Sequence, residues 1–521
     1  MQSHTSLLKL MMRQLLKTLL LLAPLGASGQ GAWTQVFPMQ SEFIQTKDAL
    51  ELDNGQWLVV ISAQHRDPPG ITTTAHSWTA VLDADGQLQE IEPLTNSGRA
   101  VLAESMMYGT DSIPLHILGV SFDSVQLNDF GVTLFQMNEL GTVTTSTDHL
   151  VGDGTHEMYF YDATLDPGNN IFLVGGVRPP LSQPLFLPNK MFLMRLGQDG
   201  QELGQDQTGT DQGLSIGQHA IRQDSLMFVS GVGLQNLSST GSSKFMRFDT
   251  SFNYLGGYSS TSLSGSGLGY PPDSLMTDCL YMTPVGNGSI IVSSRFGYTS
   301  SGARAVLGRL SSIGQQEALF MPYSGAFSEF CAAYQGHEAE PDGNIVFSVS
   351  ENYQDGPDHT LSDHSSRIHL FLLDTMLNVL CDQIAVDGAL DSAYYYVNRV
   401  KATADGGSLI MGSRLDLAGN GVPQPWIMKV APWDCNSGIA EPSEGTTATV
   451  WPNPGSQGFS IAVNGPTLAK GQLLLFDAQG QEVGSANVVQ SAATMDTQDL
   501  APSIYFYRII DEGGKVRATG R

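Results

Sequence analysis

The sequence predicts an all-β fold, a seven-bladed β-propeller followed by a small Ig-like β-sandwich, from three observations. Short apolar segments, rich in β-branched and aromatic side chains, alternate with turns rich in Gly, Asp and Asn. This unit recurs from Trp33 to Cys435, and the pattern changes after Cys435. Glycine accounts for 57 of the 521 residues, which suits a chain that makes many tight hairpin turns.

The repeat has a period of about 58 residues. In each copy a strand such as Trp57–Ile61 follows a turn, and a second strand such as Trp78–Leu82 follows a variable loop. A period of this size suits a four-stranded blade, and seven blades close into a ring without long exposed edges. A right-handed β-helix is the alternative, although its repeats are normally much shorter. The predicted turns centre on residues 54, 112, 169, 225, 287, 343 and 406.

The N-terminus has the order of segments found in a secretory signal peptide. Lys9, Arg13 and Lys17 provide positive charge without any acidic residue, and the apolar run Leu19–Leu22 follows them. Small residues then end at Gly29, where we expect cleavage. The apolar run is too short to span a bilayer, and a buried amphipathic helix is the alternative.

Domain boundaries follow from these patterns. We expect the signal peptide over residues 1–29, the propeller over 30–438 and a polar linker over 439–449. The remaining residues, 450–521, contain short alternating strands and form the second domain.

Composition and charge exclude several classes of protein. Acidic residues outnumber basic ones 51 to 25, giving a net charge of −26, so nucleic acid is not an expected partner. Apolar residues are plentiful throughout, which argues against intrinsic disorder. No second long apolar run follows the signal peptide, so we expect no membrane span.

The four cysteines all lie in the second half of the chain. An exported protein meets oxidants, so two disulfides with three alternative pairings are open, and burial of the thiols as small apolar groups is the other interpretation. No CxxC motif and no Cys–His metal spacing occurs. The residues are Cys279, Cys331, Cys381 and Cys435.

The last 70 residues carry a set of motifs with a specific resemblance. Pro452, Asn453 and Pro454 open the segment, Asp477 and Gly480 form a strand–Asp–x–x–Gly hairpin, and a Leu-x-x-x-Ile-Tyr-Phe-Tyr-Arg strand contains Tyr505. A terminal Gly-Lys pair ends at Lys515. Residues 450–521 resemble the type A C-terminal sorting domain of the type IX secretion system of Bacteroidota. The propeller repeats resemble, more weakly, Asp-Gly-Gly repeats of exported proteins from that phylum.

The resemblance implies an export route and a cellular location for the protein. Such a chain crosses the inner membrane through its signal peptide and then crosses the outer membrane with the type IX secretion machinery as partner. We therefore expect a protein that is secreted or held on the outer cell surface, reached through the periplasm. An ordinary Ig-like binding module at the end of the chain is the alternative interpretation.

One loop concentrates groups that can bind a metal ion. It contains Asp355, Asp358, His359, Asp363 and His364, whose oxygens and imidazoles could hold Ca²⁺ or a transition ion. The spacing does not match an EF-hand, and an acidic loop is more commonly only solvated. We therefore expect no cofactor, with bound Ca²⁺ as the first alternative.

Residues before and within the inner strands are candidates for a binding site. Inner strands such as Glu329–Tyr334 and Tyr394–Val400 precede the Gly-rich turns, and their entries share a face with the long loops. Carboxylates and imidazoles there could transfer protons, and tyrosines could stack on a sugar or peptide. Capping of strands and binding of channel water are the alternative roles. The candidates are His156, Glu157, His219, Asp278, Glu329, Tyr394 and Tyr395.

No catalytic signature accompanies these candidates. The sequence lacks a nucleophile elbow in a strand–helix context, an HExxH motif and a P-loop. We therefore expect a non-catalytic binding or adhesion scaffold for an extracellular glycan or protein. The alternative is a secreted enzyme that cleaves polysaccharide or peptide at the channel mouth, because fold alone does not decide function.

Overall fold

The computed structural model divides the chain into two compact units, which separate between Trp433 and Asp434 and are described individually. The structure describes residues 32–520 except 42, 68–70, 108–114, 127, 139, 153–156, 179–189, 209–215, 234–241, 260–279, 297–303, 323–328, 333–334, 352–365, 419–421, 434–446, 452–457, 465–469, 477–481, 499, 501–504 and 512–515. The predicted signal peptide therefore lies outside the described residues, as does the predicted metal-binding loop with Asp355, Asp358, His359, Asp363 and His364.

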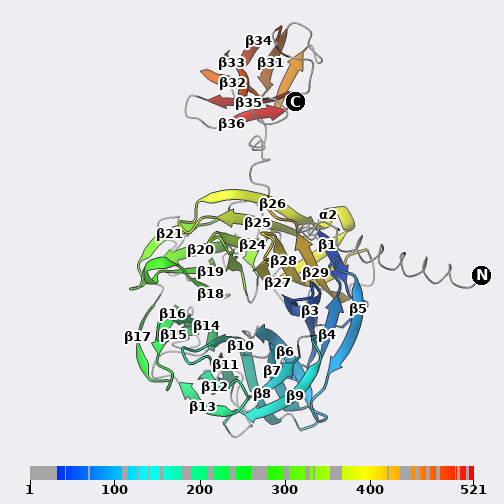
Figure 1. Cartoon of the computed structure of the whole chain (residues 1–521), viewed down its shortest axis with the longest axis vertical. Helices are drawn as coiled ribbons and strands as arrows, with labels where there is room; N and C mark the ends of the chain where they lie inside the picture. The colour runs from blue at the N-terminus through cyan, green and yellow to red at the C-terminus, as the bar shows by residue number, and fades with distance from the viewer. Residues whose placement is uncertain are drawn as a thin grey trace, which may run out of the picture. The chain divides into compact units, whose positions relative to one another are not determined.

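The described part of the first unit forms seven antiparallel sheets, each a blade of a β-propeller (Figure 1). This confirms the fold class predicted from the repeat. Blades 1 to 3 consist of β2 (Phe43–Glu51), β3 (Trp57–Asp67), β4 (Ile71–Leu82) and β5 (Leu88–Leu94); β6 (Ala100–Met107), β7 (Leu115–Asp123), β8 (Asn128–Met137) and β9 (Val143–Leu150); and β10 (Glu157–Leu165), β11 (Ile171–Arg178), β12 (Lys190–Leu196) and β13 (Glu202–Thr208).

The remaining blades follow the same order. Blades 4 and 5 consist of β14 (Ile216–Gln223), β15 (Leu226–Gly233), β16 (Ser242–Phe248) and β17 (Tyr254–Ser259); and β18 (Tyr281–Pro284), β19 (Ile290–Phe296), β20 (Arg304–Leu310) and β21 (Gln316–Phe320). Blade 6 has its inner strand in two pieces, β22 (Glu329–Cys331) and β23 (His337–Ala339), before β24 (Ile345–Glu351), β25 (Arg367–Leu373) and β26 (Val379–Asp387). Blade 7 consists of β27 (Ala393–Ala402), β28 (Ser408–Asp416), β29 (Pro423–Val430) and β1 (Trp33–Val36).

The two ends of the propeller segment close the ring. Strand β1 pairs antiparallel with β29, with Trp33 opposite Lys429 and Val36 opposite Trp426. The ring of Trp33 also meets that of Trp57 in blade 1, edge to face at 5.9 Å. The first described strand is thus the outer strand of the last blade, so the last sheet is completed by a segment far away in sequence.

Tight turns join the first and second strands of most blades, as the repeat predicted. The residue that closes the turn has a positive φ, 61° at Asn169 and 82° at Gly406, and its N–H bonds back to Asp166 or Thr403. Asn and Gly tolerate this conformation, which explains their recurrence at the turns. The one-turn 3₁₀ helix η4 (Gly286–Gly288) is the same turn in blade 5. The turn predicted at residue 112 lies outside the described residues.

Apolar side chains fill the space between neighbouring blades. One buried cluster joins blades 2 and 3 through residues such as Phe122, Phe130 and Phe160, and another joins blades 1 and 7 through Trp57 and Met411. A short helix, α2 (Gly388–Asp391), precedes β27 and is capped by the Asp387 carboxylate. Because each sheet packs on two neighbours, the inner strands are held at fixed positions around the axis.

The second unit is a seven-stranded antiparallel sheet with its own core. Its strands are ordered β30-β31-β34-β33-β32-β35-β36, and the register between β33 and β34 is the single pair Val489–Ala492. Both halves contribute to one cluster, with Ile461 and Met495 from one half and Leu473 and Ile509 from the other. The predicted sandwich is therefore a continuous sheet that folds over on itself. Its strands are β30 (Thr447–Trp451), β31 (Gly458–Asn464), β32 (Lys470–Phe476), β33 (Glu482–Val489), β34 (Ala492–Asp496), β35 (Phe506–Asp511) and β36 (Val516–Gly520).

Of the seven residues singled out in the motif of the second unit, one lies within the described part of the chain. Tyr505 is half-buried and packs against the core of this unit. The others, Pro452, Asn453, Pro454, Asp477, Gly480 and Lys515, lie outside the described residues.

Two further observations bear on the sequence analysis. Cys381 in β26 is in a disulfide bond, while Cys279, Cys435 and the side chain of Cys331 fall outside the description. Among the residues that the structure describes, no helix is long and apolar enough to cross a membrane.

Candidate binding pocket on the propeller axis

Repeated β-bulges in the inner strands build the site. In the described registers of β2, β6, β10, β14 and β27, one residue is bulged at the same level: Lys47, Glu104, Tyr161, Gln218 and Asn398. A bulge re-aims the side chains that follow it. The residues directly after these bulges are Asp48, Ser105, Asp162, His219 and Arg399, and all of them line one pocket on the axis.

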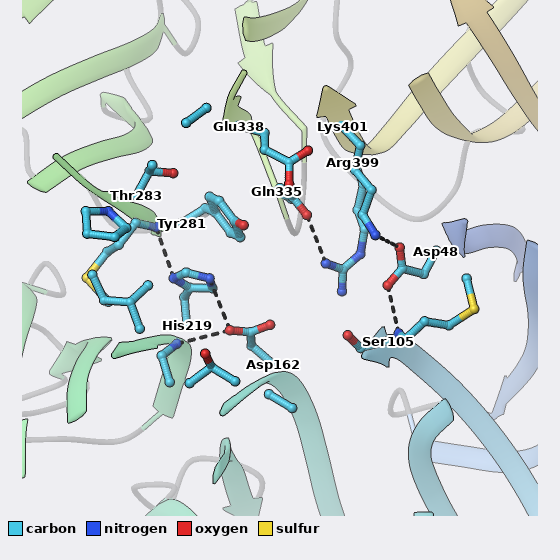
Figure 2. Close-up of a pocket in the computed structure, with 18 residues that line it drawn as sticks. Asp48, Ser105, Asp162, His219, Tyr281, Thr283, Gln335, Glu338, Arg399 and Lys401 are labelled. Carbon is cyan, nitrogen blue, oxygen red and sulfur yellow. Dashed lines mark hydrogen bonds and ion pairs between the residues drawn. The ribbon is translucent and has the colours of Figure 1, made fainter. Parts of the chain in front are cut away.

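The pocket has a volume of about 350 Å³ and receives residues from all seven blades. Beyond the bulge level it is lined by residues such as Thr164, Pro284 and Lys401, so it extends toward the ends of the inner strands where the hairpin turns begin. The volume lies at the lower end of the range typical of ligand sites. Figure 2 shows the polar side chains converging from β2, β6, β10, β14, β18, β23 and β27.

One side of the pocket pairs cations with a buried carboxylate. The Lys401 ammonium lies 2.5 Å from Asp48 Oδ1, and Asp48 Oδ2 accepts a hydrogen bond from the Met106 N–H at 2.8 Å. Burial opposes ionisation of Asp48, but Lys401 and Arg399 outweigh it and hold its pKa below the usual value. Asp48 is therefore an ionised group that links blades 1, 2 and 7.

Arg399 reaches across the channel at the level of the bulges. Its guanidinium donates to the Glu104 carbonyl in blade 2 at 3.2 Å and to Gln335 Oε1 in blade 6 at 3.3 Å. Burial disfavours its charge, yet the surrounding acidic groups, Asp48 first, raise its pKa above the usual value. Arg399 is therefore a permanent cation in the pocket, at the level of the bulges.

The opposite side is a hydrogen-bonded carboxylate–imidazole pair (Figure 2). His219 Nδ1 accepts a hydrogen bond from the Met282 N–H at 3.0 Å, so the ring proton is on Nε2, which lies 3.1 Å from Asp162 Oδ2. Burial lowers the pKa of His219 well below its usual value, so the ring is neutral. Burial also raises the pKa of Asp162 to about 7, which places its titration near neutral pH.

Tyr281 and one more acid, Glu338, complete this wall, and His337 packs against Tyr281. The Tyr281 ring lies 3.9 Å from that of His219 and 5.3 Å from that of His337, between centroids. Burial raises the pKa of Tyr281 and lowers that of His337 to about 3, so both are neutral. Glu338, whose pKa burial raises, accepts a hydrogen bond from the Ala402 N–H at 2.7 Å.

The arrangement can bind a polar group and can hold a proton near neutral pH. It offers two cations, Arg399 and Lys401, one ionised carboxylate, Asp48, and two carboxyls that burial shifts toward the protonated form, Asp162 and Glu338. Within the residues that the structure describes, no group of three or more His, Cys, Asp or Glu side chains is arranged to hold a metal ion.

The structure separates the predicted site residues from one another. His219 lines the axial pocket, and Glu157 lines a second cavity on the other side of the bulges. Tyr394 is buried in an apolar cluster shared by blades 5, 6 and 7, and Tyr395 bonds to Asp391 and Arg414. Neither tyrosine lines the pocket. The backbone of Glu329 pairs with Glu351 in blade 6, and its side chain is not described. His156 and Asp278 lie outside the described residues.

The pocket also lies away from the predicted face. We expected ligand binding at the entries of the inner strands, next to the long loops, whereas the lining extends toward the hairpin turns. Sequence reasoning missed Asp48, Asp162, Glu338, Arg399 and Lys401. One signal was present, because residues 48, 105, 162 and 219 follow one another at intervals of 57 and each is polar.

The fold and the pocket define the class of this chain as an all-β propeller with a polar axial pocket, followed by a smaller all-β unit. Residues 449–519 match the family model described as the secretion system C-terminal sorting domain. The second unit is therefore a type IX secretion sorting domain, and the chain is a β-propeller protein exported to the outer surface or the extracellular space. No curated protein matches the chain.

Solved structures resemble the chain at the level of the fold. A protein of unknown function from Dyadobacter fermentans has 11% identity and a TM-score of 0.41, covering 76% of this chain and 98% of its own. The neuraminidase-like N10 protein of a bat influenza A virus from Guatemala has 10% identity and a TM-score of 0.36, covering 78% and 98%. An ulvan lyase of family PL25 has 11% identity and a TM-score of 0.40, covering 63% and 78%.

Proposed function

We propose that this protein is an exported binding propeller whose axial pocket takes an acidic sugar residue of an extracellular or surface glycan. The observation that carries the proposal is the convergence of Arg399 and Lys401, with one ionised partner, Asp48, in a pocket of about 350 Å³. Asp162 is protonated below its pKa of about 7, and burial shifts the pKa of Glu338 in the same direction. A ligand carboxylate would interact with the two cations, and protonated Asp162 would donate a hydrogen bond to one of its oxygens.

The test uses the mature chain, residues 30–521, with glucuronic and galacturonic acid as probes and calorimetry as the measurement. We expect binding of at least one acid at pH 6 that is at least tenfold weaker for Lys401→Met. Affinity should fall between pH 6 and pH 8, because Asp162 ionises near pH 7 and then repels the ligand. Absence of binding at pH 6, or affinity that rises with pH, would contradict the proposal.

A second function, cleavage of a glycan, is favoured by one specific observation. Asp48 is held ionised while the pKa of Asp162, in the same pocket, is about 7, and two carboxyls with separated pKa values can divide the roles of base and acid. Release of reducing or unsaturated ends from acidic polysaccharides, abolished by Asp162→Asn, would establish the enzyme. Saturable binding without such products would support a binding protein and contradict the enzyme.

A further inference from the structure

A second cavity lies on the other side of the bulges from the axial pocket. It has a volume of about 220 Å³ and is lined by residues of blades 1, 2 and 3. The bulges in β6 and β10 separate the two spaces, since Glu104 and Tyr161 line this cavity while Ser105 and Asp162 line the axial pocket. The bulges in β6 and β10 therefore direct neighbouring residues of each strand into two different cavities.

Aromatic side chains form part of the wall of this second cavity. The rings of Tyr159 and Tyr161 lie 6.5 Å apart with an angle of 27° between their planes, and both side chains are partly exposed. Tyr159 is paired across the sheet with Gly176, which has no side chain to cover the ring. A glycine inside a strand often marks a position where a ligand approaches closely. A tyrosine ring has an apolar face and a polar hydroxyl, so this pair provides amphipathic surface on which a sugar can stack.

The charged side chains that line the second cavity limit the kinds of ligand that it can bind. Glu157 is 3% exposed and lines the cavity together with Gln64 and Glu104. Glu104 is balanced by Lys47, whose ammonium lies 2.8 Å from its carboxylate. None of the described lining residues is Lys, Arg or His. Carboxylate and amide oxygens accept hydrogen bonds from hydroxyl groups, and the described lining offers no cation that could pair with an anion.

We propose that this cavity is a binding subsite for a neutral oligosaccharide, with Tyr159 and Tyr161 stacking on a sugar ring and Glu157 accepting hydrogen bonds from its hydroxyls. Apolar side chains such as Phe122 and Phe130 line the cavity beside these polar groups, which is the usual composition of a ligand site. The subsite does not depend on the function proposed for the axial pocket, because that pocket carries cations and selects acidic groups.

The test measures binding of five neutral hexasaccharides to the mature chain by calorimetry. The probes are cellohexaose, xylohexaose, mannohexaose, laminarihexaose and maltohexaose, and hexagalacturonate serves as the acidic comparison. We expect at least one neutral probe to bind, with an affinity at least tenfold lower in Tyr161→Ala and at least threefold lower in Glu157→Gln. Tyr254→Ala is the matched control, because Tyr254 is an exposed tyrosine on the outer strand of blade 4.

Each outcome bears on this subsite separately from the axial pocket. Asp162→Asn should leave neutral binding within twofold of the unchanged protein, even where it alters binding of uronic acids. Failure of all five neutral probes would overturn the subsite, as would equal affinity in Tyr161→Ala and Tyr254→Ala. Loss of neutral binding in Asp162→Asn with no change in Tyr161→Ala would also overturn it. A melting curve for each variant checks that the propeller remains folded, and Tyr161→Phe should retain most of the affinity.

Discussion

Asp162 shows how neighbours in space set the chemistry of a single residue. Its carboxylate accepts hydrogen bonds from the Ala220 N–H and from His219, yet burial dominates and raises its pKa to about 7. Asp48, in the same pocket, has a lowered pKa because Lys401 and Arg399 outweigh the effect of burial. Two aspartates at the same position of the repeat therefore hold different protonation states.

The raised pKa of Asp162 predicts a dependence of stability on pH. Between the unfolded pKa of about 4 and the folded pKa of about 7, the folded state binds more protons, so the free energy of unfolding falls as pH rises. Urea unfolding at pH 4.5 and pH 8 should show this fall to be smaller in Asp162→Asn, by a few kcal/mol. The exposed Asp53→Asn serves as the control. Equal pH dependence in Asp162→Asn and the unchanged protein would contradict the prediction.

At the scale of the strand, glycines lie opposite the inner-strand bulges of blades 2, 3 and 7. Gly412 in β28 pairs with Val397 beside the bulge of β27, and a Cβ added there would lie 1.9 Å from the Tyr396 carbonyl oxygen. Gly119 and Gly175 have the same close contacts with Leu102 and Tyr159. In these three blades the second strand comes too close to the bulged strand for a side chain at this position, whereas Ile61 lies opposite the bulge of blade 1. Part of the glycine content therefore serves strand packing as well as turns.

This contact predicts a large loss of stability for one small substitution. Gly412→Ala should lower the free energy of unfolding by more than about 2 kcal/mol, because the added methyl group overlaps backbone that cannot move independently. Gly286→Ala is the matched control, since nothing lies within 4 Å of the added Cβ. Chemical unfolding of both variants checks the expectation. Similar unfolding midpoints for the two variants would show that β27 and β28 can move apart with little loss of stability.

At the scale of the whole molecule, the chain consists of two units with separate cores. The first unit is completed by β1 pairing with β29, and the second encloses its own cluster around Ile461 and Leu473. Stability of the propeller therefore should not require the sorting domain. The acidic character of the chain, with a net charge of −26, suits a protein that stays dispersed after export.

Removal of residues 446–521 tests this division and the export route together. The truncated protein should unfold at the same denaturant concentration as the propeller of the full chain, because it loses none of the blade contacts. It should also remain in the periplasm, since it lacks the sorting domain. Cell fractionation and surface proteolysis measure the location. Arrival of the truncated protein at the surface would show that another segment directs export.

Local chemistry made much of the fold predictable from the sequence. Turn residues such as Asn169 and Gly406 adopt positive φ, and the apolar strands between them recur with a regular period. The C-terminal motif likewise identified the sorting domain over the segment that the family model matches. Each of these features depends on residues close together in the chain, so the sequence displays them directly.

The sites depended on contacts between residues far apart in sequence. Of the predicted site residues, His219 lies in the axial pocket and Glu157 in the second cavity, whereas Tyr394 is part of the core. Neither the bulge that turns Asp162 toward the axis nor the approach of Lys401 to Asp48 can be read from strand periodicity. The sequence by itself determined the blades, the turns and the sorting segment. Only closure of the ring decided which polar side chains meet, because it brings seven inner strands to a common axis.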